Sequence, residues 1–337
     1  MSEDHTGNGA AAADERLAQL RREIDAVDAS IVELISRRAG FAREVGEVKK
    51  ITGAPVYRPE REAQIFAKLR AINPGPLPNA SLEAVYREII SACRELERRM
   101  RVAYLGPVGT FSEQATFTHF GSGVDGVPCH SIDEVFRSTE AQATDFGVVP
   151  VENSTEGAIN RSLDLLLQTP LRICGEVSLP IRHNLLTHSG GMEGVRRVCA
   201  HAQALAQCMQ WLDHNHPELE RVPVSSNAEG ARLASLEPGT AAIAGDAAAA
   251  RYELQVVATG IQDDPLNRTR FLVIGRKSPK KSGCDKTSIL IGLINRPGAL
   301  NEILTILSAK NIDLAKIESR PTKDKQWKYM FFLDMIG

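Results

Sequence analysis

The 337-residue sequence lacks the features that mark several protein classes. It has no apolar run of 18 residues, which argues against a membrane-spanning helix, and no apolar core near its start, which argues against a signal peptide. A net charge of −2 does not favour a general binder of nucleic acid or membranes. The six cysteines include no C-x-x-C pair, so neither a metal site nor a disulfide framework is expected. These absences favour a soluble protein of the reducing cytoplasm.

What the sequence does contain is 43% apolar residues, enough for real cores in two or three domains. Residues 1–14 are small and polar, and we expect a disordered leader there. Changes of hydrophobic period divide the rest into a helical module (residues 15–100), an α/β module (101–276), a basic linker (277–285) and a C-terminal module (286–337). The net charge changes at the same boundaries, from +3 to −7 and then to +5 for residues 277–337.

The helical module begins with a long amphipathic helix. Its apolar residues, from Leu17 to Val48, alternate spacings of three and four, and Pro55 ends the pattern. Two shorter helices are predicted, from Pro59 to Ile72 and from Ser81 to Met100. About 35 residues form a rod of roughly 50 Å, which is too long for one small domain to cover. We therefore expect a partner chain to bury the apolar seam.

Arg38 interrupts this seam at a position where the 3–4 rhythm predicts an apolar residue. A buried arginine is costly unless an anion meets it, and either a glutamate of the same fold or an anionic substrate would serve. Arg21, Lys49 and the pair Arg61-Glu62 lie near the same seam. Several cations around a bundle interior suit a small dicarboxylate, because guanidinium groups bind carboxylates in bidentate geometry.

The distinctive motifs of this module are Leu20-Arg21, Arg38, Glu44-Val45-Gly46-x-x-Lys49 and Arg61-Glu62. They resemble the all-helical chorismate mutase family, which implies an intertwined homodimer. The implied reaction rearranges chorismate to prephenate without a cofactor, by holding a compact conformer and stabilising charge on the breaking C–O bond. By the same resemblance, Arg38 and Arg21 would hold the two carboxylates, with Arg21 reaching the partner's site. Lys49 would donate to the ether oxygen, Arg61 would support a carboxylate and Glu62 would hold the hydroxyl.

Three positions depart from the best-known form of that family. Arg58 stands where an acidic residue is common, and Cys93 replaces a hydroxyl residue at a position that would contact substrate. Glu97 replaces a glutamine that would hydrogen-bond the ether oxygen, and only a protonated glutamate can donate such a bond. Mutase activity is therefore expected to fall as pH rises, unless Glu97 lies on a solvated helix face.

In the α/β module, short apolar runs alternate with amphipathic helical stretches. Three polar clusters accompany the predicted strands: Gly106-Pro107-x-Gly109-Thr110-Phe111-Ser112, Val149-Pro150-Val151-Glu152-Asn153-Ser154-Thr155-x-Gly157 and Asn267-Arg268-Thr269-Arg270-Phe271. Hydroxyls and backbone N–H groups at a helix start can bind anions, although Ser112 and Ser154 could equally be simple helix caps.

Together these clusters resemble the prephenate dehydratase family, whose two α/β lobes surround a cleft as in type II periplasmic binding proteins. The resemblance implies loss of CO2 and the ring hydroxyl from prephenate, giving phenylpyruvate, without a cofactor or metal. Hydroxide leaves poorly unless it meets a proton or strong hydrogen-bond donors. Thr269 matches the family's critical threonine, and we expect it to position and hydrogen-bond the leaving group.

Arg270 is expected to bind a substrate carboxylate, with an ion pair between the lobes as the alternative. Ala200 stands where serine is usual in the family. The next residue, His201, is expected to bind substrate, with a purely structural role as the alternative. The remaining residues expected to line the cleft and bind substrate are Thr110, Ser112, Glu152, Asn153, Ser154, Thr155, Gln203 and Phe271.

The C-terminal module is predicted to form a strand, a helix and two strands, after which the sequence stops. Its motifs are Asn295-Arg296-Pro297-Gly298-Ala299-Leu300 and Ile317-Glu318-Ser319-Arg320-Pro321. They resemble the phenylalanine-binding ACT domain, an α+β fold whose usual last helix and strand are absent here, so a partial domain is expected. The resemblance implies regulation by phenylalanine through Asn295, Gly298, Ala299, Leu300, Glu318, Ser319, Arg320 and Pro321.

The order of the three modules predicts a homo-oligomeric enzyme of phenylalanine biosynthesis that has both activities and feedback by phenylalanine. The substitutions at positions 58, 93 and 97 support an alternative, in which only the dehydratase works and the helical module is a dimerisation arm. A non-enzymatic amino-acid sensor is disfavoured, because Thr269 and the cationic helix set are both present.

Overall fold

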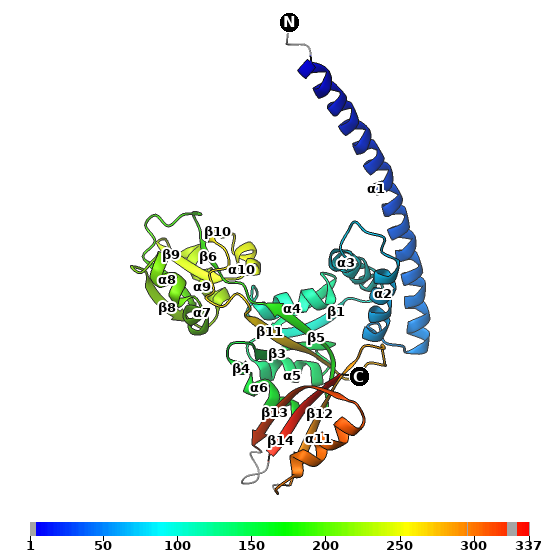
Figure 1. Ribbon diagram of the computed structural model, residues 1–337, viewed down its shortest axis with the longest axis vertical. Helices are drawn as coiled ribbons and strands as arrows, with labels where there is room; N and C mark the ends of the chain where they lie inside the picture. Colours follow the sequence, from blue (N-terminus) through cyan, green and yellow to red (C-terminus); the bar gives the residue numbers. More distant parts are fainter. Residues whose placement is uncertain (1–4, 295, 322–328, 337) are drawn as a thin grey trace.

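The computed structural model describes residues 5–294, 296–321 and 329–336 of the chain. It shows three helices, a two-lobed α/β body and a small sheet in chain order (Figure 1). The predicted fold class, a helical domain followed by a two-lobed α/β domain and an α+β domain, is confirmed. None of the helices in the described residues is long and apolar enough to cross a membrane. Asn295, which was expected in the regulatory site, lies outside the described residues.

The helical module consists of α1 (His5–Thr52), α2 (Pro59–Ile72) and α3 (Asn79–Glu97). The second and third helices pack beside the C-terminal part of α1, while its N-terminal part projects from the body (Figure 1). The start of α1 at His5 differs from the expected disordered leader. The run Ala10–Ala13 accounts for this extension, because alanine has the highest helix propensity of any residue.

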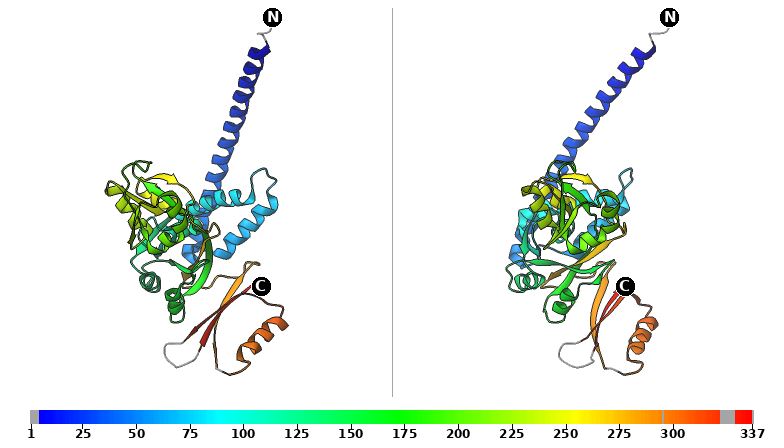
Figure 2. Two further views of the ribbon diagram at one scale, coloured as in Figure 1. Left: turned by 60° about the vertical axis from the view of Figure 1, so that its left-hand side comes forward. Right: turned by 90° about the vertical axis from the view of Figure 1, so that its left-hand side faces the viewer.

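No other part of the chain that the structure describes covers the apolar seam of α1. Its residues Leu17, Ile24, Val27, Ile31 and Leu34 are 46–62% exposed. The helix points away from the other modules in all the views of Figures 1 and 2. A stripe of this kind is the surface that a second helix covers in paired bundles.

Lobe one of the α/β module is built on the sheet β2-β1-β3-β11-β5, in which β11 is antiparallel to both of its neighbours. Its strands are β1 (Met100–Leu105), β2 (Val124–Cys129), β3 (Phe146–Asn153), β4 (Gly157–Ala158, paired with β3), β5 (Arg172–Pro180) and β11 (Arg268–Gly275). Helix α4 (Phe111–Phe120) packs on one face, and α5 (Ile132–Glu140) and α6 (Asn160–Leu166) pack on the other.

Lobe two is built on the sheet β10-β6-β9-β7-β8. Its strands are β6 (Asn184–Thr187), β7 (Arg197–His201), β8 (Glu220–Val224), β9 (Thr240–Ala244) and β10 (Gln255–Ala258). Its helices are α7 (Ala202–Gln207), α8 (Met209–Asn215), α9 (Asn227–Leu236) and α10 (Asp246–Arg251). The chain passes between the lobes twice, at residues 181–183 and again at 259–267.

The C-terminal module contains β12 (Lys286–Leu293), α11 (Ala299–Ala309), β13 (Asp313–Pro321) and β14 (Tyr329–Ile336). The strands form an antiparallel sheet in the order β12-β14-β13. The module lies against lobe one, on the side away from lobe two (Figure 1).

The helical and α/β modules share one hydrophobic core. Tyr57, in the loop between α1 and α2, is 6% exposed and packs with Phe120 of α4 and Phe146 of β3. The guanidinium of Arg94 lies 5.2 Å from the centre of the Tyr57 ring and donates to the carbonyl of Phe120. The α1–α2 loop is therefore anchored inside lobe one and is not a free linker.

Candidate functional site

In the helical module, four side chains that were expected in the site meet between α1 and α3. Nη1 of Arg38 lies 3.0 Å from Sγ of Cys93. Nζ of Lys49 lies 2.9 and 3.2 Å from the two carboxylate oxygens of Glu97. Gly46 permits this approach, because a Cβ there would lie 2.9 Å from Cγ of Glu97. The Glu97 side chain is thus directed into the helical interface and not onto a solvated face.

Glu62 joins the same cluster from α2. Its Oε1 lies 3.0 Å from Nη1 of Arg94, and Arg38 and Lys49 also act on it electrostatically. Burial raises the pKa of Glu62 above the ordinary carboxyl value, although these cations lower it. Arg94 was not among the expected residues. The available signal was its position four residues after Ile90, on the buried face of α3.

Three other expected residues are not part of this cluster. Arg21 is exposed on the projecting part of α1, about 25 Å along the helix from Arg38 at 1.5 Å per residue. Arg58 pairs with Glu60 at 2.9 Å and lines a separate cavity at the junction with the α/β module. Arg61 is exposed in the first turn of α2.

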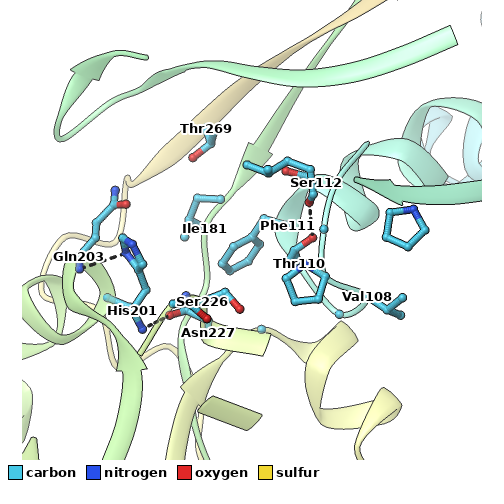
Figure 3. A pocket seen from close by; sticks show the side chains of 18 of the residues that line it. Val108, Thr110, Phe111, Ser112, Ile181, His201, Gln203, Ser226, Asn227 and Thr269 are labelled. Atoms are coloured by element: carbon cyan, nitrogen blue, oxygen red, sulfur yellow. Dashed lines mark hydrogen bonds between the residues drawn. The ribbon is translucent and has the colours of Figure 1, made fainter. Parts of the chain in front are cut away.

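A cavity of about 770 Å³ lies between the two lobes of the α/β module. Figure 3 shows Thr110 and Ser112 on one wall, His201 and Gln203 on the opposite wall, and Thr269 above them. The expected residues that line the cavity are Thr110, Ser112, Asn153, His201, Gln203 and Thr269.

Asn153 holds the hydroxyl of Thr269 across the β3–β11 pair. Its amide Nδ2 donates to Oγ1 of Thr269 at 2.9 Å. The orientation of this amide is fixed, because its Oδ1 accepts the backbone N–H groups of Thr155 and Glu156. Since the hydroxyl oxygen of Thr269 accepts from Asn153, its own hydrogen is free to donate into the cavity.

A buried polar chain continues this arrangement into the crossing segments. Oδ1 of Asn267 accepts from Asn153, and Nδ2 of Asn267 donates to Oε1 of Gln207 at 3.0 Å. The same Gln207 oxygen lies 3.0 Å from Nε2 of His183. Burial lowers the pKa of His183, although its bond to Gln207 raises it, which leaves a neutral ring at pH 7. Asn267, Gln207 and His183 were missing from the expected set, although Asn267 stands inside the third polar cluster.

The first turn of α4 forms part of the cavity wall. Thr110 caps the helix by accepting the N–H of Glu113, and Glu113 in return accepts the N–H of Gly109 at 2.6 Å, as in a capping box. Gly109 has a φ of +88°, and a Cβ there would lie 3.3 Å from Cα of Ala248 in lobe two. Glycine at this position therefore lets the turn approach the opposite lobe.

The N-terminal ends of helices, and not cationic side chains, form the parts of the wall that could meet an anion. The first residues of α4 and α9 face the cavity, the latter through Ser226 and Asn227 (Figure 3). His201 caps α7 by accepting the N–H of Gln203, in line with its structural reading. Among the described residues that line the cavity, none is lysine or arginine. An anion in the cavity would therefore meet helix N-termini and polar side chains.

Five residues expected in the cleft lie outside its wall. Ser154 accepts the backbone N–H of Arg268, and Thr155 bonds Asn267, so both join β3 to β11. Phe271 belongs to the core of lobe one. Glu152 and Arg270 face the C-terminal module, because side chains alternate between the two faces of a strand.

Of the expected regulatory residues, Gly298, Ala299 and Leu300 form the start of α11, where Gly298 has a φ of +82°. Residues 318–321 lie on β13. Arg320 reaches the α/β module, where its Nη2 lies 2.9 Å from Asp164 of α6. The second C-terminal motif is thus in direct contact with lobe one.

The chain matches three protein-family models in order. These are chorismate mutase type II over residues 20–98, prephenate dehydratase over residues 102–279 and the ACT domain over residues 287–337.

The chain is also similar to known proteins over most of its length. It is 48% identical, over 96% of this chain and 90% of the relative, to the bifunctional chorismate mutase/prephenate dehydratases of Stutzerimonas stutzeri and Pseudomonas aeruginosa. A crystal structure of an Arthrobacter aurescens prephenate dehydratase in complex with L-Phe superimposes with a TM-score of 0.65 and 34% identity, covering 70% of this chain and 80% of that one. The Staphylococcus aureus prephenate dehydratase superimposes with a TM-score of 0.62 and 32% identity, covering 70% and 89%.

Proposed function

The chain belongs to the family of bifunctional chorismate mutase/prephenate dehydratases, and from this premise we propose how its two sites work. The cluster around Arg38 rearranges chorismate to prephenate, and the cavity around Thr269 converts prephenate to phenylpyruvate. The observation that carries the second assignment is the Thr269 hydroxyl, which accepts from Asn153 and keeps its hydrogen for a ligand.

In the dehydratase reaction, the C–C bond to the ring carboxylate breaks and its electron pair completes the aromatic ring. The C–O bond to the ring hydroxyl breaks at the same time, and one proton joins the departing hydroxide to give water. Prephenate and a proton thus yield phenylpyruvate, CO2 and water. The Thr269 hydroxyl is a poor acid, so its role is to donate a hydrogen bond to the leaving oxygen while the proton comes from solvent.

The two carboxylates of prephenate are met without a cationic side chain. The first turns of α4 and α9 offer backbone N–H groups at the cavity wall, beside the Ser112 and Ser226 side chains. Helix N-termini carry partial positive charge, which favours anions. The absence of lysine and arginine from the described lining supports this division of roles.

In the helical module, Arg38, Lys49, Glu62 and Glu97 converge on one place. We assign Arg38 to a chorismate carboxylate, Lys49 and Glu97 to the ether oxygen, and Glu62 to the hydroxyl. Such a site needs no acid or base that changes state, because positioning and charge stabilisation lower the barrier of a rearrangement.

The site is completed in a homodimer. Arg21 lies on the exposed part of α1, far from the cluster of its own chain, and the apolar seam beside it is uncovered. Pairing α1 with a second copy would bury the seam and carry Arg21 into the partner's site.

The C-terminal module is assigned to feedback by phenylalanine. Its match to the ACT family and the L-Phe bound in the Arthrobacter relative support this assignment. Six free thiols, five of them buried, agree with a reducing cytoplasm as the place of action.

Two variants test the assignment of the sites. Arg38→Ala should abolish conversion of chorismate and leave the turnover of added prephenate intact, while Thr269→Ala should do the reverse. Prephenate and phenylpyruvate are followed separately, with and without phenylalanine. Equal loss of both activities in either variant would contradict separate sites, and a wild-type protein that turns over only prephenate would favour the dimerisation-arm alternative.

A further inference from the structure

Arg270 follows Thr269 on β11, yet the two side chains serve different modules. Thr269 lines the cavity, and Arg270 points through the opposite face of the sheet. Nη2 of Arg270 lies 2.5 Å from Asp334 of β14 and 2.7 Å from Glu176 of β5. Its Nη1 lies 3.6 Å from Glu152 of β3. The residue beside the candidate catalytic hydroxyl is therefore bound to the C-terminal module.

Every strand of the C-terminal sheet takes part in this contact. Lys286 of β12 pairs with Glu176 at 2.9 Å, and Lys316 of β13 pairs with Glu152 at 2.7 Å. Ser288 of β12 donates to Asp334 at 2.6 Å. The +5 charge of residues 277–337 and the −7 charge of the α/β module thus meet at this interface.

The Arg270–Asp334 pair lies away from solvent, with side chains that are 16% and 11% exposed. Burial alone would lower the pKa of Arg270, but Asp334 and Glu176 outweigh it and hold the pKa above the ordinary value. Removing one partner of a shielded pair leaves the other charge without compensation, so the position of each depends on the other.

Backbone geometry links this pair to the cavity. The register of β11 against β3 shifts between Arg270 and Phe271, one pair beyond Thr269–Asn153, where Val151 of β3 is the extra residue. A bulge of this kind re-aims the side chains beside it. The direction of Thr269 therefore depends on how Arg270, the residue beside this bulge, is held.

We propose that Arg270 is a positioning residue through which Asp334 of the C-terminal module sets the place of the Thr269 hydroxyl. The proposal rests on the assignment of the Thr269 cavity to the dehydratase. It gives the C-terminal module a direct contact with the reaction: a ligand that displaces β14 moves Asp334, then Arg270, then the hydroxyl that meets the leaving group.

The test compares steady-state turnover of prephenate in the full-length protein, in the absence of phenylalanine. Asp334→Asn and Arg270→Met should lower kcat by about tenfold or more, with KM within about twofold, because misplacing a donor acts on the transition state. Arg270→Lys should recover part of the loss. The double variant should be no slower than Arg270→Met alone, since both changes break one link.

Two control variants separate this role from others. Arg268→Met removes a cation from the same face of β11, where it bonds only Ser178 among the contacts described. Asp164→Asn weakens a second contact between the C-terminal module and lobe one, the pair with Arg320, away from β11. Both should keep kcat close to wild type, and mutase turnover should stay unchanged in every variant. Thermal unfolding of each variant shows whether it is folded. Ser288→Ala, which removes one hydrogen bond to Asp334, should lower kcat less than Asp334→Asn does.

Other outcomes overturn the proposal. If Arg270→Met raised KM while Asp334→Asn kept wild-type kcat and KM, Arg270 would be a substrate ligand. Equal losses of kcat in Asp334→Asn and Asp164→Asn would reduce the contact to docking of the two modules. Wild-type kcat in all the variants would remove the proposed link. If instead the cavity around Thr269 were not the dehydratase site, Thr269→Ala would retain prephenate turnover, which distinguishes that failure from failure of this proposal.

Discussion

The phenolic oxygen of Tyr57 lies 2.7 Å from Nε2 of His119, and this contact joins the helical module to α4 of lobe one. Tyr57 is buried and His119 is partly buried, and Arg94 bridges from the Tyr57 ring to the end of the same helix. The first turn of α4 forms part of the wall of the cavity between the lobes. The helical module therefore completes the core that positions the second site, and the two catalytic modules are expected to unfold together.

Stability should fall between pH 7.5 and 5 because of His119. Burial, assisted by Arg87 and Arg94, lowers its pKa from 6.5 to about 3. The unfolded chain binds a proton near pH 6.5 while the folded chain does not, so unfolding is favoured as pH falls below that value. The single residue accounts for a loss of about 2 kcal/mol in the free energy of unfolding at pH 5.

Urea unfolding of wild type, His119→Gln and Tyr57→Phe at pH 7.5 and pH 5 measures this loss in the free energy of unfolding. His119→Gln should lose less stability than wild type, and Tyr57→Phe, which retains the histidine, should lose as much as wild type. His183, which is also buried with a lowered pKa, contributes equally in all three. The same acid loss in His119→Gln and wild type would show that the histidine is not the cause.

Asn153 should control the direction of the Thr269 hydroxyl. In Asn153→Asp, a carboxylate replaces the amide that donates at 2.9 Å, and the Thr269 hydroxyl would donate to it instead of to substrate. We expect kcat for prephenate to fall by roughly 10²-fold, a typical effect of losing one aligned donor. Thr269→Ser, which keeps the hydroxyl, should retain most of the activity. Stopped turnover in Thr269→Ser and full turnover in Asn153→Asp would contradict this role.

The sequence predicted the modules better than it predicted the direction of individual side chains. The helical period, the alternation of short apolar runs with helical stretches, and the polar motifs are all local patterns. They predicted the three modules in their observed order. Arg270 and Glu152 were expected in the cleft because they stand beside Thr269 and Asn153. Strand alternation sends them to the other face, where the partner Asp334 lies 64 residues away in the chain. Such a partner is set by tertiary packing, which no local pattern contains.

Mixing two inactive variants should restore part of the mutase activity. If Arg21 acts in the partner's site, the heterodimer of Arg21→Ala and Arg38→Ala contains one site with both arginines and one with neither. Random exchange at equal concentrations makes half of the dimers mixed, so activity should return to about one quarter of wild type. Chorismate consumption after co-refolding measures it, and each variant refolded alone is the control. No recovery, with dimers confirmed by light scattering, would place both arginines in one chain's site.

The Lys49–Glu97 pair predicts how mutase activity depends on pH. Nζ of Lys49 lies 2.9 and 3.2 Å from the two Glu97 oxygens, and a glutamate can donate to the ether oxygen only in its protonated form. Substrate must therefore meet a glutamate that has taken up a proton, and kcat/KM for chorismate should rise as the pH is lowered. Glu97→Gln supplies a permanent donor, and its amide leaves Lys49 free for the same ether oxygen. The variant should show a flat profile and exceed wild type at mildly alkaline pH. A wild-type profile that is already flat from acid to mildly alkaline pH would mean that Lys49 alone supplies the hydrogen bond.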